Sequence, residues 1–200
     1  MAMPIDPSAA MEWALETCCH LLGGDQPEHG RMTAPSMQWQ MPEAGSLKIN
    51  VDGAYSQEPS TGATGAVLSD SSGNFFAASA RWLDSLGSAL LAEAEALRDG
   101  VQLIPGGTRE RIILKTDSQE LASLWNNRRM HRSEIAAILE DVEEMASNFI
   151  SFQVLHTRLS ANFAAHLCAQ HASSFLANFV WLQPPSFLQN CLQFDCNNAV

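Results

Sequence analysis

The stretch LKINVDGAY, residues 47–55, decides how the rest of the sequence is interpreted. Apolar and polar residues alternate from Leu47 to Val51, which is the period of a strand that buries one face more deeply than the other. The dipeptide Asp52-Gly53 favours a turn, so we expect the strand to end there. The stretch therefore predicts a strand with a carboxylate at its end.

Two more carboxylates have comparable settings, Glu93 in LLAEAEALRDG (residues 90–100) and Asp117 in RIILKTDSQ (residues 111–119). Each lies at the edge of an apolar helix or strand pattern, an arrangement that gathers negative charge for a hard metal cation. If the strands before Asp52 and Asp117 are neighbours, both aspartates project from one edge of the sheet. The ordinary alternatives are a turn for Asp52, a surface charge for Glu93 and a helix cap for Asp117.

Helical geometry distinguishes Glu93 from Glu95. At about 100° per residue, an apolar stripe from Leu90 to Ile104 faces the sheet, with Glu93 at its border and Glu95 on the far side. We therefore expect Glu93 to point along the sheet edge toward a site and Glu95 to face solvent.

The remaining periodicity predicts elements in the order β-β-β-α-β-α-α-β-α. The expected strands cover residues 47–52, 65–68, 75–78, 111–116 and 149–156. The expected helices cover residues 88–104, 118–127, 133–147 and a last one that Asn162 caps and that ends before Pro184. This order indicates an α/β domain whose first three strands form an antiparallel meander.

Composition limits the class of protein. A chain of 200 residues with 46% hydrophobic and 16% charged residues is typical of one globular domain. Its net charge of -11 argues against binding nucleic acid by bulk electrostatics, so such a role needs a local basic patch. The five cysteines include no C-x-x-C pair, and no signal peptide or membrane span is evident. We expect a soluble, intracellular protein.

The domain is expected to cover residues 39–185. Residues 1–38 are interpreted as an N-terminal extension, with a short amphipathic helix at 9–22 followed by a linker rich in Pro, Gly and Met. Residues 186–200 are interpreted as a C-terminal tail.

The ordered motifs resemble the type 1 ribonuclease H domain, in particular its plant retroelement-derived branch. The resemblance covers roughly residues 39–185 and rests on Trp39, GSLKINVDGA (45–54), TGAVLSD (64–70), AEAEALRDG (92–100), TDS (116–118) and NFAAHLC (162–168). Each motif is weak alone, but the ordered set is specific.

The resemblance implies a ribonuclease H-like fold, with a five-stranded mixed sheet in the order 3-2-1-4-5 and helices on both faces. It also implies an enzyme that cuts the RNA strand of an RNA/DNA hybrid with two Mg²⁺ ions, or Mn²⁺, held by Asp52, Glu93 and Asp117. Carboxylate oxygens are the ligands that Mg²⁺ prefers, and a pair of ions suits an in-line displacement at phosphorus.

One position departs from the family pattern. Catalytically competent members carry a fourth carboxylate where this chain has His166, and imidazole suits transition metals better than Mg²⁺. The resemblance thus makes His166 a fourth candidate catalytic residue. The alternative is a first-turn helix residue without a ligand role.

The only dense basic cluster lies between two predicted helices and contains Arg128, Arg129 and Arg132. It is a candidate nucleic-acid contact, about where some relatives carry a basic substrate-binding protrusion, and the alternative is a solvated loop. The leading function is a ribonuclease H-type endonuclease, or a domesticated descendant with weak activity. The other two are a non-catalytic domain that binds RNA or RNA/DNA hybrid, and a protein-interaction module.

Overall fold

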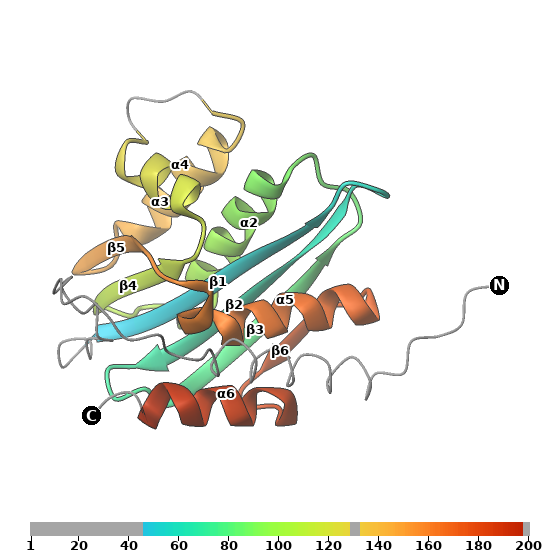
Figure 1. The fold of residues 1–200 in the computed structure, drawn as a ribbon. Coiled ribbons are helices and arrows are strands. Elements are labelled where there is room, and N and C mark those ends of the chain that lie inside the picture. The colour runs from blue at the N-terminus through green and yellow to red at the C-terminus, as the bar shows by residue number, and fades with distance from the viewer. Residues whose placement is uncertain (1–45, 129–132, 198–200) are drawn as a thin grey trace, which may run out of the picture. The chain divides into compact units, whose positions relative to one another are not determined.

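The computed structural model describes residues 46–128 and 133–197, whose strands form one mixed sheet in the order β5-β4-β1-β2-β3-β6 (Figure 1). The strands are β1 (Ser46–Ser56), β2 (Thr61–Asp70), β3 (Phe75–Leu83), β4 (Arg111–Thr116), β5 (Ser151–His156) and β6 (Phe179–Trp181). The helices are α2 (Ala89–Gln102), α3 (Gln119–Asn126), α4 (Ala136–Ala146), the 3₁₀ turn η1 (Leu159–Ala161), α5 (Phe163–Phe175) and α6 (Ser186–Asn197). The predicted order of the first five strands is confirmed, but the predicted count of five strands is wrong.

Strand β1 lies at the centre of the sheet. It pairs with β2 in antiparallel register, with Asp52 opposite Gly65, and with β4 in parallel register up to the pair Asn50 and Lys115. The prediction that β1 ends at Asp52-Gly53 was wrong, because pairing with β2 continues to Ser56. Asp52 therefore lies in a part of β1 that still pairs with β2 on one side but no longer pairs with β4 on the other.

Helices cover both faces of the sheet, as predicted (Figure 1). On one face, α2, α3 and α4 pack on a core that contains Ile49, Val51, Leu114 and Val154. On the other face, α5 packs on β2 and β3 through a smaller cluster centred on Cys168. Ser88 caps α2 by accepting a hydrogen bond from the backbone N–H of Leu91, so the predicted helix start is confirmed to within one residue.

Two glycines allow the helices to approach the sheet closely. A Cβ atom added at Gly53 would lie 2.4 Å from the backbone nitrogen of Glu93 on α2. One added at Gly65 would lie 2.1 Å from the carbonyl oxygen of Ala165 on α5. Because any larger residue would push these helices away, the two glycines fix the distance from the sheet to the helices that carry Glu93 and His166.

The C-terminal part differs from the predicted single helix. Helix α5 ends at Phe175, Leu176 takes a left-handed conformation (φ 51°), and Phe179–Trp181 then pairs with β3. The aromatic and β-branched residues of this short run suit a strand better than a helix. Rings of Phe175, Phe179, Trp181 and Phe187 surround His171 at centroid distances of 4.6–5.5 Å, which joins α5, β6 and α6.

The described structure continues past residue 185 with α6, whose Leu188 is fully buried in the cluster under α5. The predicted helix at residues 9–22 and the linker after it lie outside the described residues, and the domain boundaries at 38 and 185 stay predictions. Within residues 46–128 and 133–197, none of the helices combines the length and apolar character needed to cross a bilayer.

Candidate metal centre

The three carboxylates singled out in the sequence converge. Asp52 on β1, Glu93 on α2 and Asp117 just after β4 each offer a carboxylate oxygen, and these oxygens lie within 4.8 Å of one another. Asp52 and Asp117 meet because β1 and β4 are parallel neighbours. The sequence predicted that both aspartates project from one edge of the sheet if these two strands are neighbours. Glu93 reaches them from α2, which crosses β1 at Gly53. Among the described residues, this is the group of acidic, histidine and cysteine side chains that could hold a metal ion.

The negative charges of this carboxylate cluster are close together and are not balanced by enough positive charge. Burial, reinforced by the charges of Asp52 and Asp117, raises the pKa of Glu93 from 4.5 to about 8. Burial and the charge of Asp52 likewise raise the pKa of Asp117. Each shift reflects the cost of placing like charges together away from water. A divalent cation would remove that cost, so the donor set fits a hard metal ion.

His166 lies beside the cluster. Its Nδ1 is 3.0 Å from Oδ2 of Asp52, and this hydrogen bond raises the pKa of the imidazole despite partial burial. The ring reaches Asp52 from the first turn of α5, the helix that Gly65 allows to sit close to the sheet. The structure thus places His166 in direct contact with a candidate metal ligand, and its role as a catalytic residue stays a prediction.

Asn162 has a contact that sequence reasoning missed. It occupies the predicted cap position of α5, but its side chain makes no capping hydrogen bond. Instead, its Nδ2 donates to the backbone carbonyl of Val51 at 2.8 Å and to Oδ1 of Asp117 at 2.9 Å. Its Oδ1 accepts a hydrogen bond from Asn50 at 2.9 Å. The only sequence signal was the asparagine in the terminal motif, which carries no indication of a partner more than a hundred residues earlier.

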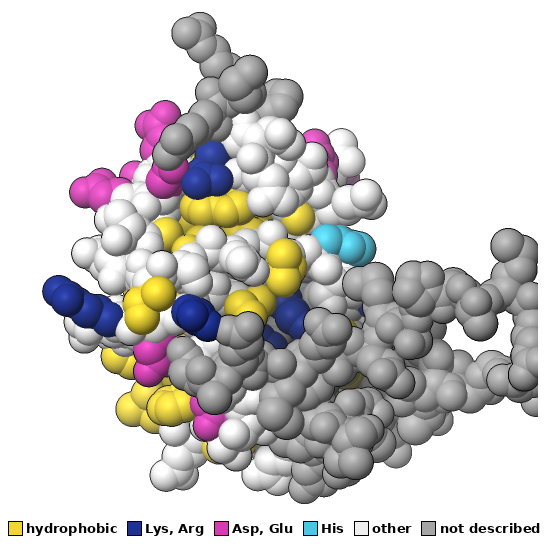
Figure 2. All heavy atoms as spheres, turned by 90° about the vertical axis from the view of Figure 1, so that its left-hand side faces the viewer, with side chains coloured by type: hydrophobic (Ala, Val, Ile, Leu, Met, Phe, Trp, Pro, Cys, Tyr) yellow, Lys and Arg dark blue, Asp and Glu magenta, His cyan; other side chains and the backbone are white. Residues whose placement is uncertain are grey.

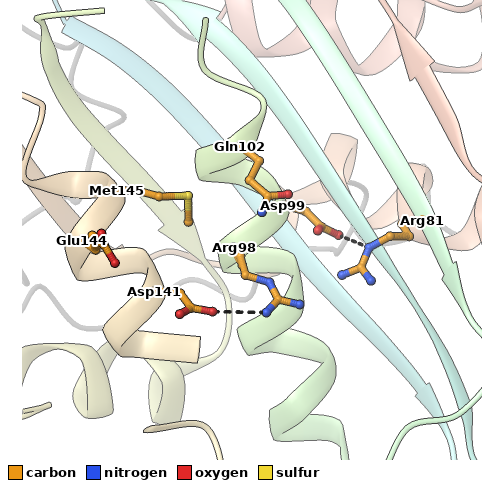
Figure 3. Close-up of a pocket in the computed structure, with 7 residues that line it drawn as sticks. All are labelled: Arg81, Arg98, Asp99, Gln102, Asp141, Glu144 and Met145. Atoms are coloured by element: carbon orange, nitrogen blue, oxygen red, sulfur yellow. Dashed lines mark hydrogen bonds and ion pairs between the residues drawn. The ribbon is translucent and has the colours of Figure 1, made fainter. Parts of the chain in front are cut away.

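The expectation that Glu95 faces solvent was wrong. Its side chain is 15% exposed and forms ion pairs with Arg81 of β3 and with Arg98, one turn along α2. Arg81 also binds Asp99, and Arg98 also lies near Asp141 of α4, as Figure 3 shows around the hollow that these side chains line. The helical wheel placed Glu95 away from the site correctly, but it could not show that β3 supplies a cation on that side. This network stabilises the packing of α2 and is separate from the carboxylate cluster.

Of the predicted basic cluster, Arg128 can be placed. Its guanidinium carbon lies 4.1 Å from the centre of the Trp125 ring, and its Nη2 donates to Glu143 of α4 at 3.0 Å. These contacts join α3 to α4. Arg129 and Arg132 lie outside the described residues, so the nucleic-acid contact stays a prediction. Figure 2 shows one face of the protein, on which the Lys and Arg side chains of the described part are distributed among hydrophobic, uncharged and acidic groups.

The sheet order, the helices on both faces and the position of Asp52 on β1 beside Asp117 after β4 define a ribonuclease H-like α/β fold. The chain belongs to the reverse transcriptase-like family, whose profile matches residues 50–172. Among the curated proteins, a sequence search finds no match.

Solved structures agree with this fold. The ribonuclease H1 of the halophilic archaeon Halobacterium salinarum is 20% identical with a TM-score of 0.60, covering 66% of this chain and 99% of its own. LC11-RNase H1, isolated from compost and solved with an RNA/DNA hybrid, is 16% identical with a TM-score of 0.59, covering 66% of this chain and 99% of its own. A foamy viral protease-reverse transcriptase, also solved with an RNA/DNA hybrid, is 14% identical with a TM-score of 0.54, covering 76% of this chain and 23% of its own.

At these identities the structural likeness establishes the fold alone. Together with the family, it supports the expectation of a ribonuclease H-type nuclease. The assignment to the plant retroelement-derived branch stays a prediction.

Proposed function

We propose that this protein is a metal-dependent endonuclease that cuts the RNA strand of an RNA/DNA hybrid, with Asp52, Glu93, Asp117 and His166 as its catalytic residues. The convergence of three carboxylate oxygens within 4.8 Å carries the proposal. The family supports it, and two structures of similar fold were solved with RNA/DNA hybrids.

Asp52, Glu93 and Asp117 would hold the ions, two Mg²⁺ in our proposal, with Mn²⁺ as an alternative. Such ions, when bound, activate a water molecule and stabilise the leaving oxygen of an in-line displacement at phosphorus. Each carboxylate has a neighbour that fixes it: the Thr116 hydroxyl donates to Glu93, Asn162 donates to Asp117, and His166 lies against Asp52. These contacts orient the oxygens before a cation arrives, which reduces the reorganisation needed on binding.

His166 shapes the choice of metal in this proposal. Three carboxylates suit Mg²⁺, whereas an imidazole beside Asp52 favours a metal that accepts nitrogen ligands, such as Mn²⁺. At its Nδ1 the ring can also hold a proton against Asp52, and its side chain is 41% exposed, so it can exchange that proton with water. We therefore expect stronger activity with Mn²⁺ than with Mg²⁺.

The test is cleavage of a labelled RNA/DNA hybrid by the full chain with Mg²⁺ or Mn²⁺. Asp52→Asn and Asp117→Asn should lose cleavage, and Glu95→Gln, which changes an acidic residue on the same helix as Glu93 but outside the cluster, should retain it. Cleavage that is absent from the unsubstituted protein, or unchanged in the two aspartate variants, overturns the proposal. Salt-dependent binding of hybrid without cleavage would instead support the non-catalytic binding domain.

A further inference from the structure

The Asn162 side chain is completely buried at the point where β1 and β4 stop pairing. Both of its amide protons are used, one on the Val51 carbonyl of β1 and one on Oδ1 of Asp117 after β4. A single side chain from the start of α5 therefore bridges two strands beyond their last backbone pair. It does so at the position from which the metal-binding aspartates project.

The orientation of this amide is determined by its neighbours. Asn50 donates through Nδ2 both to the carbonyl of Ala161 and to Oδ1 of Asn162. If the Asn162 amide were flipped, its oxygen would face the Val51 carbonyl and the Asp117 carboxylate, which are both acceptors. The Ala161 carbonyl thus fixes the orientation of the Asn50 amide, and Asn50 together with the Val51 carbonyl fixes that of Asn162. In this orientation the Asn162 amide donates a hydrogen bond to Asp117.

An amide is a suitable partner for a carboxylate that must also bind a cation. It holds one carboxylate oxygen by a hydrogen bond but carries no charge, so it does not repel an incoming metal ion. An Arg or Lys in this position would satisfy Asp117 and compete with the cation. Asn162 therefore restricts the rotation of the Asp117 carboxyl and leaves the negative charge of the cluster in place.

We propose that Asn162 is a positioning residue of the metal centre, which holds Asp117 in its cation-binding orientation and fixes the start of α5 to it. This inference rests on the proposed function, because it concerns the same carboxylates. Asn162 and His166 stand one turn apart on α5 and contact Asp117 and Asp52 respectively, so α5 is attached to two metal ligands at once.

The first experiment measures Mn²⁺ binding to the full chain by electron paramagnetic resonance of the free ion. Asn162→Ala should weaken binding about tenfold or more, the usual effect of removing a partner of a metal ligand. Leu188→Ala is the matched control, since it removes a fully buried side chain of the apolar cluster under α5 and lies outside the hydrogen-bond network of Asn162. The control should lower the melting temperature comparably and keep the Mn²⁺ affinity within about threefold of the unsubstituted protein. Equal weakening in both variants, or none in Asn162→Ala, overturns the inference.

The second experiment needs no metal and no substituted Asn162. In the ¹⁵N-labelled metal-free protein, the side-chain NH₂ signals of Asn162 should exchange slowly with water and shift in Asp117→Asn. Rapid exchange, or signals that do not respond to Asp117→Asn, overturns the inference even if Mn²⁺ binds. If the unsubstituted protein binds no Mn²⁺ while these signals behave as expected, the proposed function fails and the contact between Asn162 and Asp117 stands.

Discussion

Nδ1 of His166 lies 3.0 Å from Oδ2 of Asp52, so an imidazole lies directly against one of the three clustered carboxylates. The contact lowers the negative charge of the site in proportion to the protonation of the ring. The candidate metal centre therefore differs from a cluster of four carboxylates in its charge and in the type of its side chains, and the predictions on pH, on cations and on His166 follow from this difference and from the burial of Glu93.

The stability of the metal-free protein should fall as the pH rises. The pKa of Glu93 is raised in the folded state from 4.5 to about 8, so the folded state binds more protons than the unfolded state between these values. The contribution of Glu93 to the free energy of unfolding is therefore greatest below pH 4.5. It declines toward pH 8, by up to about 1.4 kcal/mol per pH unit. Asp117 and His166 have raised pKa values and contribute in the same direction. Urea unfolding in EDTA across this range measures the slope.

Glu93→Gln is the control for that slope. The variant removes the buried titrating group and should make the stability of the metal-free protein less dependent on pH between 5 and 8. If the slopes of the two proteins agree, Glu93 is not the group that titrates.

Divalent cations should stabilise the protein, and more strongly at pH 8 than at pH 6, because Glu93 must lose its proton to bind a metal. At a metal concentration one hundred times the dissociation constant, the gain in unfolding free energy is about 2.7 kcal/mol. Thermal unfolding with Mn²⁺ at the two pH values measures the effect. Asp117→Asn should reduce the gain, and a gain that is independent of both pH and Asp117 would place the bound ion elsewhere.

Replacing His166 with Asp should shift the metal preference from Mn²⁺ toward Mg²⁺. A fourth carboxylate adds a hard oxygen ligand, so we expect His166→Asp to bind Mg²⁺ about tenfold more tightly. The same change adds a like charge to the cluster and should lower the melting temperature of the metal-free protein. Isothermal titration with Mg²⁺ and a melt in EDTA together test the prediction. Unchanged Mg²⁺ affinity would show that residue 166 lies outside the coordination sphere.

Gly53→Ala should destabilise the fold by about 2–3 kcal/mol, because the new Cβ would overlap the backbone of α2. Moving α2 away also moves Glu93, so Mn²⁺ binding should weaken in the variant. Gly106→Ala provides the control, since an added Cβ there meets no atom within 4 Å. Chemical unfolding and Mn²⁺ titration of both variants decide the matter, and equal stabilities would contradict the close approach of α2 to β1.

Arg128 and Arg129 should respond differently to alanine. Arg128→Ala removes the stacking on Trp125 and the ion pair with Glu143, which should cost about 1 kcal/mol of stability with little effect on hybrid binding. Arg129→Ala and Arg132→Ala should weaken hybrid binding. Each should also reduce the slope of log affinity against log salt concentration by about one. Filter binding at several salt concentrations distinguishes them. Loss of hybrid affinity in Arg128→Ala at unchanged stability would reverse the assignment.

The sequence sufficed where local pattern and strand order determine the outcome. Alternation in β1, the apolar run of β4 and the wheel of α2 were enough to select Asp52, Asp117 and Glu93 and to anticipate their convergence. It did not suffice where the partner is distant or the element is short. The ion pair between Glu95 and Arg81 depends on β3, and the contacts of the Asn162 side chain depend on β1 and on the residue after β4. Strand β6 has three residues, too few for a periodic signal.

Strand β6 also has a consequence for solubility. It pairs with residues Ala78–Ala80, in the middle of β3, so the nine-residue β3 is not left as a free border of the sheet. An unpaired strand of that length offers a row of backbone donors and acceptors to other chains and promotes aggregation. The three residues of β6 suffice to pair with the central positions of β3. Because β6 is so short, its own free edge offers few backbone groups for pairing with another chain. The short segment after α5 thus protects the domain against intermolecular strand pairing.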